Sequence, residues 1–197
     1  MPTKRQEQKE ATRQLIIKTA MDVYAQYGFS VPTSLIAKQA GLAHGSVFAH
    51  FPTVEDLVSC VLQTFFDDLG LRLHNLSSMG CTIEELLSFH LSVLEEHEAL
   101  YKRIICETAL LPKDTQISLI CAQSVVSYHL SRALEKGIAE GTIKNVPLHM
   151  LFNTWLGLVH YYLQNSELFS PNDSVLRRYK GELIGCYTAL IKQEETR

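Results

Sequence analysis

The sequence predicts an all-α protein of about nine helices, and three observations support this fold class. Apolar residues recur at helical spacing along most of the 197-residue chain. No segment alternates apolar and polar residues over the length of a strand. Glycine and proline fall between the periodic segments, where they end helices and begin turns. We expect a small module at residues 1–52 and a larger helical domain at residues 53–197.

The first helix is predicted from the apolar positions within residues 15–27, which repeat at helical spacing and stop at Gly28. It should span about five turns. The stretch before it carries four cations, Lys4, Arg5, Lys9 and Arg13. This stretch is interpreted either as a solvated tail or as an arm that contacts phosphate groups.

The second and third helices follow from residues 33–51, TSLIAKQAGLAHGSVFAHF. Pro32 suits the first turn of a helix, and Gly41 can adopt the left-handed conformation that ends one. A further helix at residues 44–50 turns Val47 and Phe51 towards the core. Its outer face then carries small and polar side chains, namely His44, Gly45, Ser46, Ala49 and His50. Two short helices joined by a tight turn, with such a face, are typical of a helix-turn-helix that enters the major groove of DNA.

The later helices are expected at about residues 54–75, 83–96, 97–110, 114–140, 148–165 and 174–193. Two of their N-termini carry the capping-box pattern, Thr53 with Asp56 and Thr82 with Glu85. The longest helix should be amphipathic and end at Gly141. Its apolar positions are Ile117, Ile120, Cys121, Ser124, Val125, Tyr128, Leu134 and Ile138.

Composition excludes several classes of protein. Hydrophobic residues make up 46% of the chain and charged residues 20%, as in an ordinary soluble protein. No run approaches the roughly 18 apolar residues of a membrane span, so we expect a cytoplasmic protein without membrane insertion. The net charge is −3, yet residues 1–60 carry six cations against five anions. The N-terminal module is therefore the more basic part, though weakly.

The five cysteines are widely dispersed and form no CxxC pair: Cys60, Cys81, Cys106, Cys121 and Cys186. An odd, scattered set indicates buried thiols in a reducing cytosol rather than a disulfide framework. A redox-sensing pair is the alternative interpretation.

A set of ordered positions lies between about residues 10 and 60. They are Ile36-Ala37, Ala40-Gly41-Leu42, Gly45-Ser46, Phe48, His50-Phe51 and Glu55-Asp56-Leu57. The set resembles the DNA-binding region of the TetR (tetracycline-repressor) family of bacterial transcriptional regulators. The rest of the chain resembles the family only in its helical layout. The resemblance implies a homodimer that binds double-stranded operator DNA and is relieved by an unknown small-molecule effector, without a cofactor.

Carried over position by position, the resemblance implies DNA contacts at Thr33, Lys38, Ala43, His44, Gly45, Ser46, Phe48 and His50. Three positions depart from the family pattern. Phe48 stands where Tyr is usual, Val54 where a phosphate-binding Lys is frequent, and Ala43 where Ser or Thr usually caps the recognition helix. We expect these losses to weaken non-specific binding and its dependence on salt.

The last two helices carry more apolar surface than one core can bury, so they lie in the middle of a bundle or meet a second subunit. The family's dimer interface uses these helices, which the resemblance places at Leu151, Trp155, Val159, Tyr162, Leu183, Tyr187 and Leu190. The effector cavity would be lined by Phe65, Phe66, Phe89, His97, Tyr101, Tyr128 and Trp155. Aromatic residues at helical spacing also pack ordinary cores, which is the alternative for each of them.

Two other functions are weaker predictions. His90 and His97 would share a helical face, and Glu107 is the nearest candidate for a third ligand, but a metal site needs closer ligands, so no metal is expected. No phosphate loop, nucleophile elbow or HExxH helix is present, so no catalytic residue and no enzyme are expected. An all-α adaptor that binds protein through a degenerate helix-turn-helix is the alternative function, motivated by Phe48 and Val54.

Overall fold

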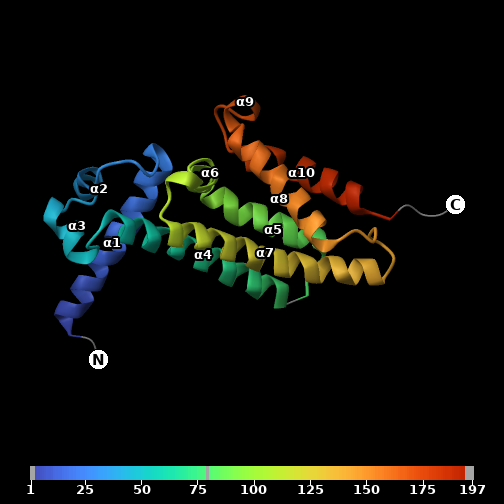
Figure 1. Ribbon diagram of the computed structural model, residues 1–197, viewed down its shortest axis with the longest axis horizontal. Helices are drawn as coiled ribbons and strands as arrows, with labels where there is room; N and C mark the ends of the chain where they lie inside the picture. Colours follow the sequence, from blue (N-terminus) through green and yellow to red (C-terminus); the bar gives the residue numbers. More distant parts are fainter. Residues whose placement is uncertain (1–2, 79, 194–197) are drawn as a thin grey trace. The chain divides into compact units, whose positions relative to one another are not determined.

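The computed structural model describes residues 3–78 and 80–193, and within them every regular element is a helix (Figure 1). In chain order these elements are α1 (Lys4–Tyr27), α2 (Thr33–Gln39), α3 (His44–His50), α4 (Val54–Ser78), α5 (Ile83–Glu96), α6 (Glu98–Cys106), the 3-10 helix η1 (Thr108–Leu110), α7 (Lys113–Ala139), α8 (Leu148–Gln164), α9 (Ser166–Phe169) and α10 (Val175–Ile191). The all-α prediction is confirmed. The sequence analysis missed α9, which has only four residues.

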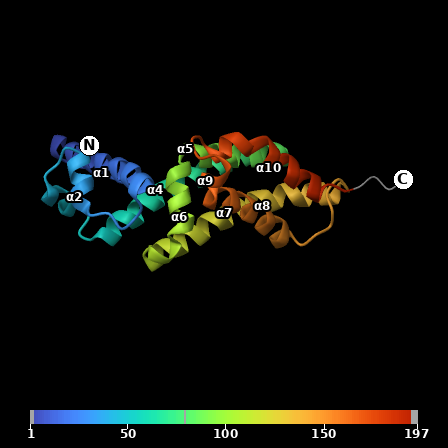
Figure 2. The same cartoon turned by 90° about the horizontal axis from the view of Figure 1, so that it is seen from above.

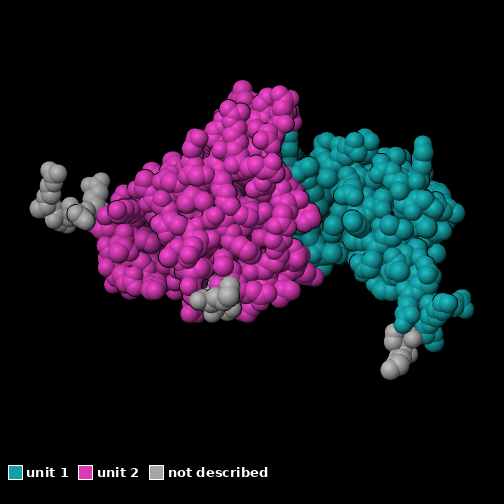
Figure 3. Space-filling view, turned by 180° about the vertical axis from the view of Figure 1, so that it is seen from behind, with its two compact units in different colours: residues 1–66, 99–119 teal, residues 67–98, 120–197 magenta. Residues whose placement is uncertain are grey.

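The chain folds into two compact units, shown in different colours in Figure 3. Unit 1 comprises residues 1–66 and 99–119, and unit 2 comprises residues 67–98 and 120–197. The long helices α4 and α7 each run through both units, so neither unit is one continuous stretch of chain. The functional boundary expected at residues 52 and 53 stays a prediction.

Unit 1 contains the helix-turn-helix and is organised around α1. Ile16, Ala20 and Val23 of α1 are fully buried, α2 packs against α1, and α3 packs against α2. Ile36 of α2 and Val47 of α3 are buried as their helical spacing predicted. The expected division of α3 into a buried and an outward face is therefore present.

The first helix is longer than its apolar pattern indicated. It spans 24 residues and begins at Lys4, because Thr3 and Gln6 form a capping box that holds its N-terminus. Its first half consists mainly of polar residues that favour helices but show no apolar period. From Lys4 onwards this stretch is helical and mostly exposed, and its two interpretations, a solvated tail or an arm that contacts phosphate groups, both stay predictions.

Three local predictions about turns and caps are confirmed. Gly41 has a φ of 68°, in the left-handed region that favours glycine. The Thr53 hydroxyl accepts a hydrogen bond from the Asp56 N–H at 3.0 Å, and the Asp56 carboxylate accepts one from the Thr53 N–H at 3.0 Å. The equivalent pair at Thr82 and Glu85 caps α5.

The outer face of α7 corrects an expectation. Ile117, Ile120 and Tyr128, assigned to its buried stripe, have exposed fractions of 58%, 62% and 57%. The buried face instead carries Thr115, Leu119, Val126, His129, Leu130 and Leu134. The helix is apolar on two sides, and the more continuous apolar pattern belongs to the exposed side. Hydrophobicity alone did not show which side faces the core.

In unit 2, α10 packs against both α5 and α8 (Figures 1 and 2). Trp155 of α8 and Tyr187 of α10 are fully buried, with ring centroids 5.2 Å apart. The Tyr187 hydroxyl donates to the Leu151 carbonyl oxygen at 3.0 Å, so the buried phenol keeps a partner. Among the described residues, no helix combines the length and apolar character that crossing a membrane requires.

Candidate DNA-binding and effector sites

The short helices α2 and α3 are held at a fixed angle by the turn between them. The Leu42 N–H donates to the Ala37 carbonyl oxygen at 2.9 Å, which closes the turn through Gly41. Val47 and Phe51 anchor α3 with exposed fractions of 1% and 3%. Ala43 is the N-cap residue of α3. It makes no side-chain capping bond, because its methyl group cannot accept a hydrogen bond.

His44 at the start of α3 is oriented by two contacts. Its Nε2 lies 3.0 Å from the Thr33 hydroxyl oxygen, and the Phe48 ring packs edge-on against it with centroids 5.3 Å apart. Thr33 is 7% exposed, whereas His44 and Phe48 are exposed. The Thr33 hydroxyl, predicted to contact phosphate, is thus also a support for His44. The imidazole is held in place before any DNA is bound.

The other predicted DNA-contacting residues lie on the same two helices. Lys38 and Gly45 are exposed, while Ser46 and His50 are half-buried. A Cβ atom at Gly45 would meet no protein atom within 4 Å, so packing does not explain the glycine. Among the described residues, the buried Nδ1 of His50 has no hydrogen-bond partner. These positions form an open, polar surface, and their contacts with DNA stay predictions.

Arg13 is an internal brace of unit 1 rather than part of a free arm. Its guanidinium donates to the Cys60 Sγ at 3.0 Å and lies over the Phe51 ring, 4.9 Å from the centroid. It therefore ties α1 to α4 and to the end of α3. Sequence spacing did not reveal this role, because 47 residues separate Arg13 from Cys60.

A second brace joins α6 to the turn between α1 and α2. The Glu107 carboxylate accepts a hydrogen bond from the Phe29 N–H at 2.9 Å and pairs with Arg103 at 3.1 Å. Arg103 also donates to the Gln26 carbonyl oxygen at 3.2 Å. Gly28 has a φ of 83°, and a Cβ atom there would lie 2.6 Å from a Glu107 oxygen. These four residues, Gln26, Gly28, Arg103 and Glu107, are called the turn clamp below.

The main cavity of the described residues lies in unit 2 and has a volume of about 1120 Å³. Its wall is built by the end of α4, the start of α5, the second half of α7, residues 142–143 and the end of α10. A second cavity, of about 10 Å³, lies between Trp155, His90 and five apolar side chains. Only the first is large enough for a small organic molecule.

The predicted ligand-binding aromatics do not meet in that cavity. Tyr128 lines it, and Trp155 lines the small cavity. Phe89 lies under the Arg72 guanidinium, and His97 follows the last residue of α5. The others, Phe65, Phe66 and Tyr101, are buried in unit 1. Their ligand-binding role stays a prediction, and the cavity adds wall residues from α5 and α10 that sequence analysis did not single out.

His90 is part of a buried hydrogen bond. Its Nδ1 accepts a hydrogen bond from the Trp155 Nε1–H at 3.1 Å, which requires an unprotonated Nδ1. Burial first and the nearby His160 second lower the pKa of His90 to about 4. His97 lies beyond the end of α5, and Glu107 belongs to the turn clamp, so these three residues do not form the metal site that was considered.

The predicted dimer residues divide into two groups. Leu151, Trp155, Val159, Leu183 and Tyr187 are at most 5% exposed within the chain itself. Tyr162 is half-buried, and Leu190 is 56% exposed. The outer faces of α8 and α10 instead present other side chains, among them Met150 and Tyr161 at 52% and 55% exposed. A subunit contact on these helices would use those outer faces.

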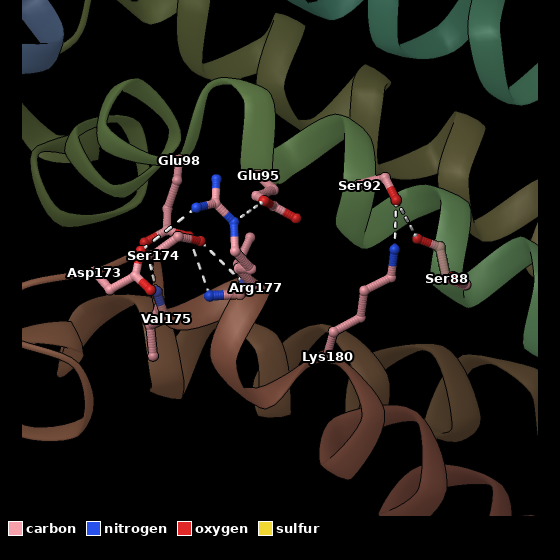
Figure 4. A network of polar contacts seen from close by, with 10 residues as sticks. Ser88, Ser92, Glu95, Glu98, Asp173, Ser174, Val175, Arg177 and Lys180 are labelled. Carbon is pink, nitrogen blue, oxygen red and sulfur yellow. Dashed lines mark hydrogen bonds and ion pairs between the residues drawn. The ribbon is translucent and has the colours of Figure 1, made fainter.

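A polar network fixes the N-terminus of α10 (Figure 4). The Glu98 carboxylate accepts hydrogen bonds from the Ser174 hydroxyl at 2.5 Å and from the N–H groups of Val175 and Leu176 at 3.0 and 3.1 Å. Arg177 pairs with Glu95 at 2.7 Å. Glu98 thus supplies the capping charge that α10 needs from a distant helix, which local sequence signals did not predict.

The N-terminal module is similar to a known protein family. Residues 16–60 match the model of a family described as bacterial regulatory proteins, tetR family. The chain is also 28% identical over 128 residues to the uncharacterised HTH-type transcriptional regulator YuxN of Bacillus subtilis (strain 168). That match covers 61% of this chain and 44% of YuxN, so the chain spans less than half the length of this curated relative.

Solved structures show the same fold over nearly the whole chain. A putative transcriptional regulator from Saccharomonospora viridis, in complex with choline, has a TM-score of 0.79 at 17% identity, covering 94% of this chain and 100% of that one. The regulator FadR from Bacillus subtilis, in complex with stearoyl-CoA, has a TM-score of 0.72 at 20% identity, covering 90% and 98%. At such low identity these matches establish the fold alone.

Proposed function

Because this chain belongs to the TetR family of bacterial transcriptional regulators, we propose that it represses transcription as a homodimer that binds a palindromic operator and releases it when a small molecule binds. Its partner is double-stranded DNA in the bacterial cytoplasm. Members of this family regulate transcription and are not enzymes.

The exposed face of α3 is the observation that carries the proposal. It combines an oriented imidazole at His44, a bare backbone at Gly45 and the hydroxyl of Ser46. A helix that enters the major groove needs a narrow polar surface, because bulky side chains would hold it away from the base edges. The glycine has no packing role in the chain and leaves room for a partner to approach.

The homodimer is supported by the outer faces of α8 and α10. Gly157, Gly181 and Gly185 lie within these helices, where a glycine costs about 1 kcal/mol relative to alanine. A Cβ atom at any of the three would meet no atom of the chain within 4 Å. The exposed Tyr161 lies one helical turn after Gly157, so this face of α8 offers an apolar surface that a second subunit can approach closely.

The large cavity of unit 2 is the proposed effector site. Two relatives of this fold hold small molecules, stearoyl-CoA in one and choline in the other. Helix α4 offers a route for coupling, since only three residues separate it from α3 and its His74 lines the cavity. A shift of α4 on ligand binding needs to supply only about 1 to 3 kcal/mol of coupling to weaken operator binding.

Phosphate contacts are proposed to be fewer than usual. Phe48 has no phenolic hydroxyl and Val54 no ammonium group, and Arg13 is engaged with Cys60 and Phe51. The other cations of residues 1–60 are Lys38 and, on α1, Lys4, Arg5, Lys9 and Lys18. We expect a shallow dependence of binding on salt concentration.

Selection of bound duplexes from a random DNA pool tests this proposal and its alternative. A repressor dimer should enrich a palindrome whose half-sites lie about one helical turn apart. Failure to enrich any sequence would favour the alternative, an all-α adaptor in which the helix-turn-helix no longer binds DNA. A pull-down with the same pool at low salt separates weak DNA binding from none.

A further inference from the structure

The large cavity of unit 2 is apolar where it is buried. Leu86 and Ile191 are 4% and 5% exposed, and both line its wall. The buried His129 also lines the cavity, and burial first and His74 second lower its pKa, which disfavours its charged form. The interior therefore suits a hydrocarbon group rather than a charged one.

The charges of the wall lie on its exposed part, and cations outnumber carboxylates there. Arg132, Lys136 and Lys192 line the cavity, against Glu84 and Glu140. Glu140 lies 4.0 Å from Lys136, and this pair leaves Arg132 and Lys192 against Glu84. Glu84 lies in the first turn of α5, where the helix dipole stabilises a negative charge.

Arg132 is the cation best placed to receive a ligand. Among the described residues, its side chain forms no ion pair, and its hydrogen bond is with the Tyr128 hydroxyl at a long 3.5 Å. Tyr128 also lines the cavity, so this bond holds the guanidinium along the wall. A guanidinium presents a planar fork of donors that matches the two oxygens of an acid group.

We propose that this cavity binds an amphipathic organic anion, with its acid group at Arg132 and its hydrocarbon part against Leu86 and Ile191. The inference rests on the proposed function, because it names the chemical class of the effector. Carboxylates and phosphate monoesters share the required chemistry, since each presents a pair of oxygens to the guanidinium. A quaternary ammonium ligand is disfavoured at this position, because it would bring a further positive charge to Arg132.

Four ten-carbon probes test the class, each titrated calorimetrically into the full-length protein below its micellar concentration. Decanoate and decyl phosphate are the anions, decan-1-ol is neutral, and decyltrimethylammonium is a cation. At least one anion should bind roughly tenfold or more tighter than decan-1-ol, the size of a charge-assisted hydrogen bond. Comparing the two anions identifies the acid group. Equal affinities for all four probes would overturn the proposal.

Arg132→Gln should remove the preference for the anion while leaving the affinity for decan-1-ol unchanged. Arg178→Gln is the matched control, because Arg178 is exposed in unit 2 but does not line the cavity. Its anion affinity should equal that of the unsubstituted protein. A similar loss in both variants, or none in Arg132→Gln, would contradict the assignment of the acid group to Arg132.

Probe binding is measured without DNA, which separates this inference from the proposed function. An anion that binds through Arg132 but does not release the operator supports the ligand class and contradicts the effector role of the cavity. A protein that never binds DNA but still binds the anion contradicts repression alone. A protein that binds its operator but none of the probes contradicts the inference alone.

Discussion

The hydrogen bond between Thr33 and His44 gives the outward face of α3 a defined geometry before DNA arrives. An imidazole already held in one orientation loses little side-chain entropy when it contacts a base. Gly45, the next residue, has no side chain, so the surface of the helix is open at this position. His44 therefore supplies a fixed polar group and Gly45 supplies free space. One substitution can test each residue.

Gly45→Ala should leave the fold intact and weaken operator binding about tenfold. The added methyl group meets no protein atom, so only an approaching DNA strand can clash with it. Fluorescence anisotropy with labelled operator measures the affinity. Gly70→Ala in α4 is the matched control, because its Cβ would make an ordinary 3.8 Å contact with Val125 of α7. Unchanged affinity for Gly45→Ala would mean that DNA does not approach this position.

Acidification should destabilise the fold through His90. Its pKa is lowered to about 4 in the folded chain, against about 6.5 when unfolded. Between these values the unfolded chain binds the extra proton, so stability falls as pH falls, by roughly 2 kcal/mol from pH 7 to 5. Urea unfolding at both pH values measures the loss.

His90→Gln should lose less stability than the unsubstituted protein over the same pH interval, because glutamine can accept the Trp155 bond without titrating. His149→Gln is the control, since His149 is exposed, and it should keep the original pH dependence. Equal pH dependence in all three proteins would show that His90 is not the group responsible.

Element by element, the helices followed from the sequence where the apolar period was strong. Gly41 and the capping boxes at Thr53 and Thr82 marked boundaries correctly, because caps and turns are set by local chemistry. The buried face of α7 did not follow, since the helix is apolar on both sides and burial depends on its neighbours. The same limit applies to the cavity, whose wall joins residues of five segments.

Sequence patterns also did not predict the contacts between elements that lie far apart along the chain. Glu107 lies 78 residues from Phe29, and Glu98 a similar distance from the N-terminus of α10. In the sequence each is an ordinary surface glutamate. Their roles depend on which helices pack together, which no spacing rule predicts. By contrast, the outward residues of α3 were predicted correctly as a face, because one helix determines them.

The turn clamp predicts a non-additive pair of substitutions. Gly28→Ala places a methyl group against the Glu107 carboxylate at a φ of 83° and a ψ of 179°, a conformation nearly restricted to glycine. Gly41→Ala, with a φ of 68° and open space, should cost about 1 kcal/mol of unfolding free energy, and Gly28→Ala should cost more.

Removing the carboxylate should relieve part of that cost. Gly28→Ala with Glu107→Ala should be more stable than the sum of the two single losses predicts, by at least about 0.5 kcal/mol. Chemical unfolding of the four proteins in the cycle gives the coupling free energy. Strict additivity would show that Glu107 does not press against Gly28 in solution.

The proposed repression requires two features of the whole molecule, a surface for DNA in unit 1 and a surface for a second subunit in unit 2. One α3 helix can contact only half of a palindrome, so the second copy supplies most of the specificity. The weak positive charge of the N-terminal module makes this doubling more important, because few cations are available for the phosphate backbone.

Leu190→Glu should convert the dimer into a monomer and lower operator affinity at least tenfold. Leu190 is 56% exposed in the single chain, so the substitution leaves the protomer folded but places two carboxylates in the proposed contact. Leu71→Glu, at a residue 62% exposed on α4, is the control and should stay dimeric. Sedimentation at micromolar concentration decides between them. A dimeric Leu190→Glu protein would place the interface elsewhere.

The central claim is that this protein recognises one DNA sequence through α3, and one binding measurement tests it most directly. Fluorescence anisotropy titrations compare the selected operator with a shuffled duplex of the same composition at physiological salt. We expect a preference of at least about a thousandfold for the operator, falling by roughly 1 to 3 kcal/mol in each of His44→Ala and Ser46→Ala. Equal affinity for both duplexes, or full preference in both variants, would contradict it.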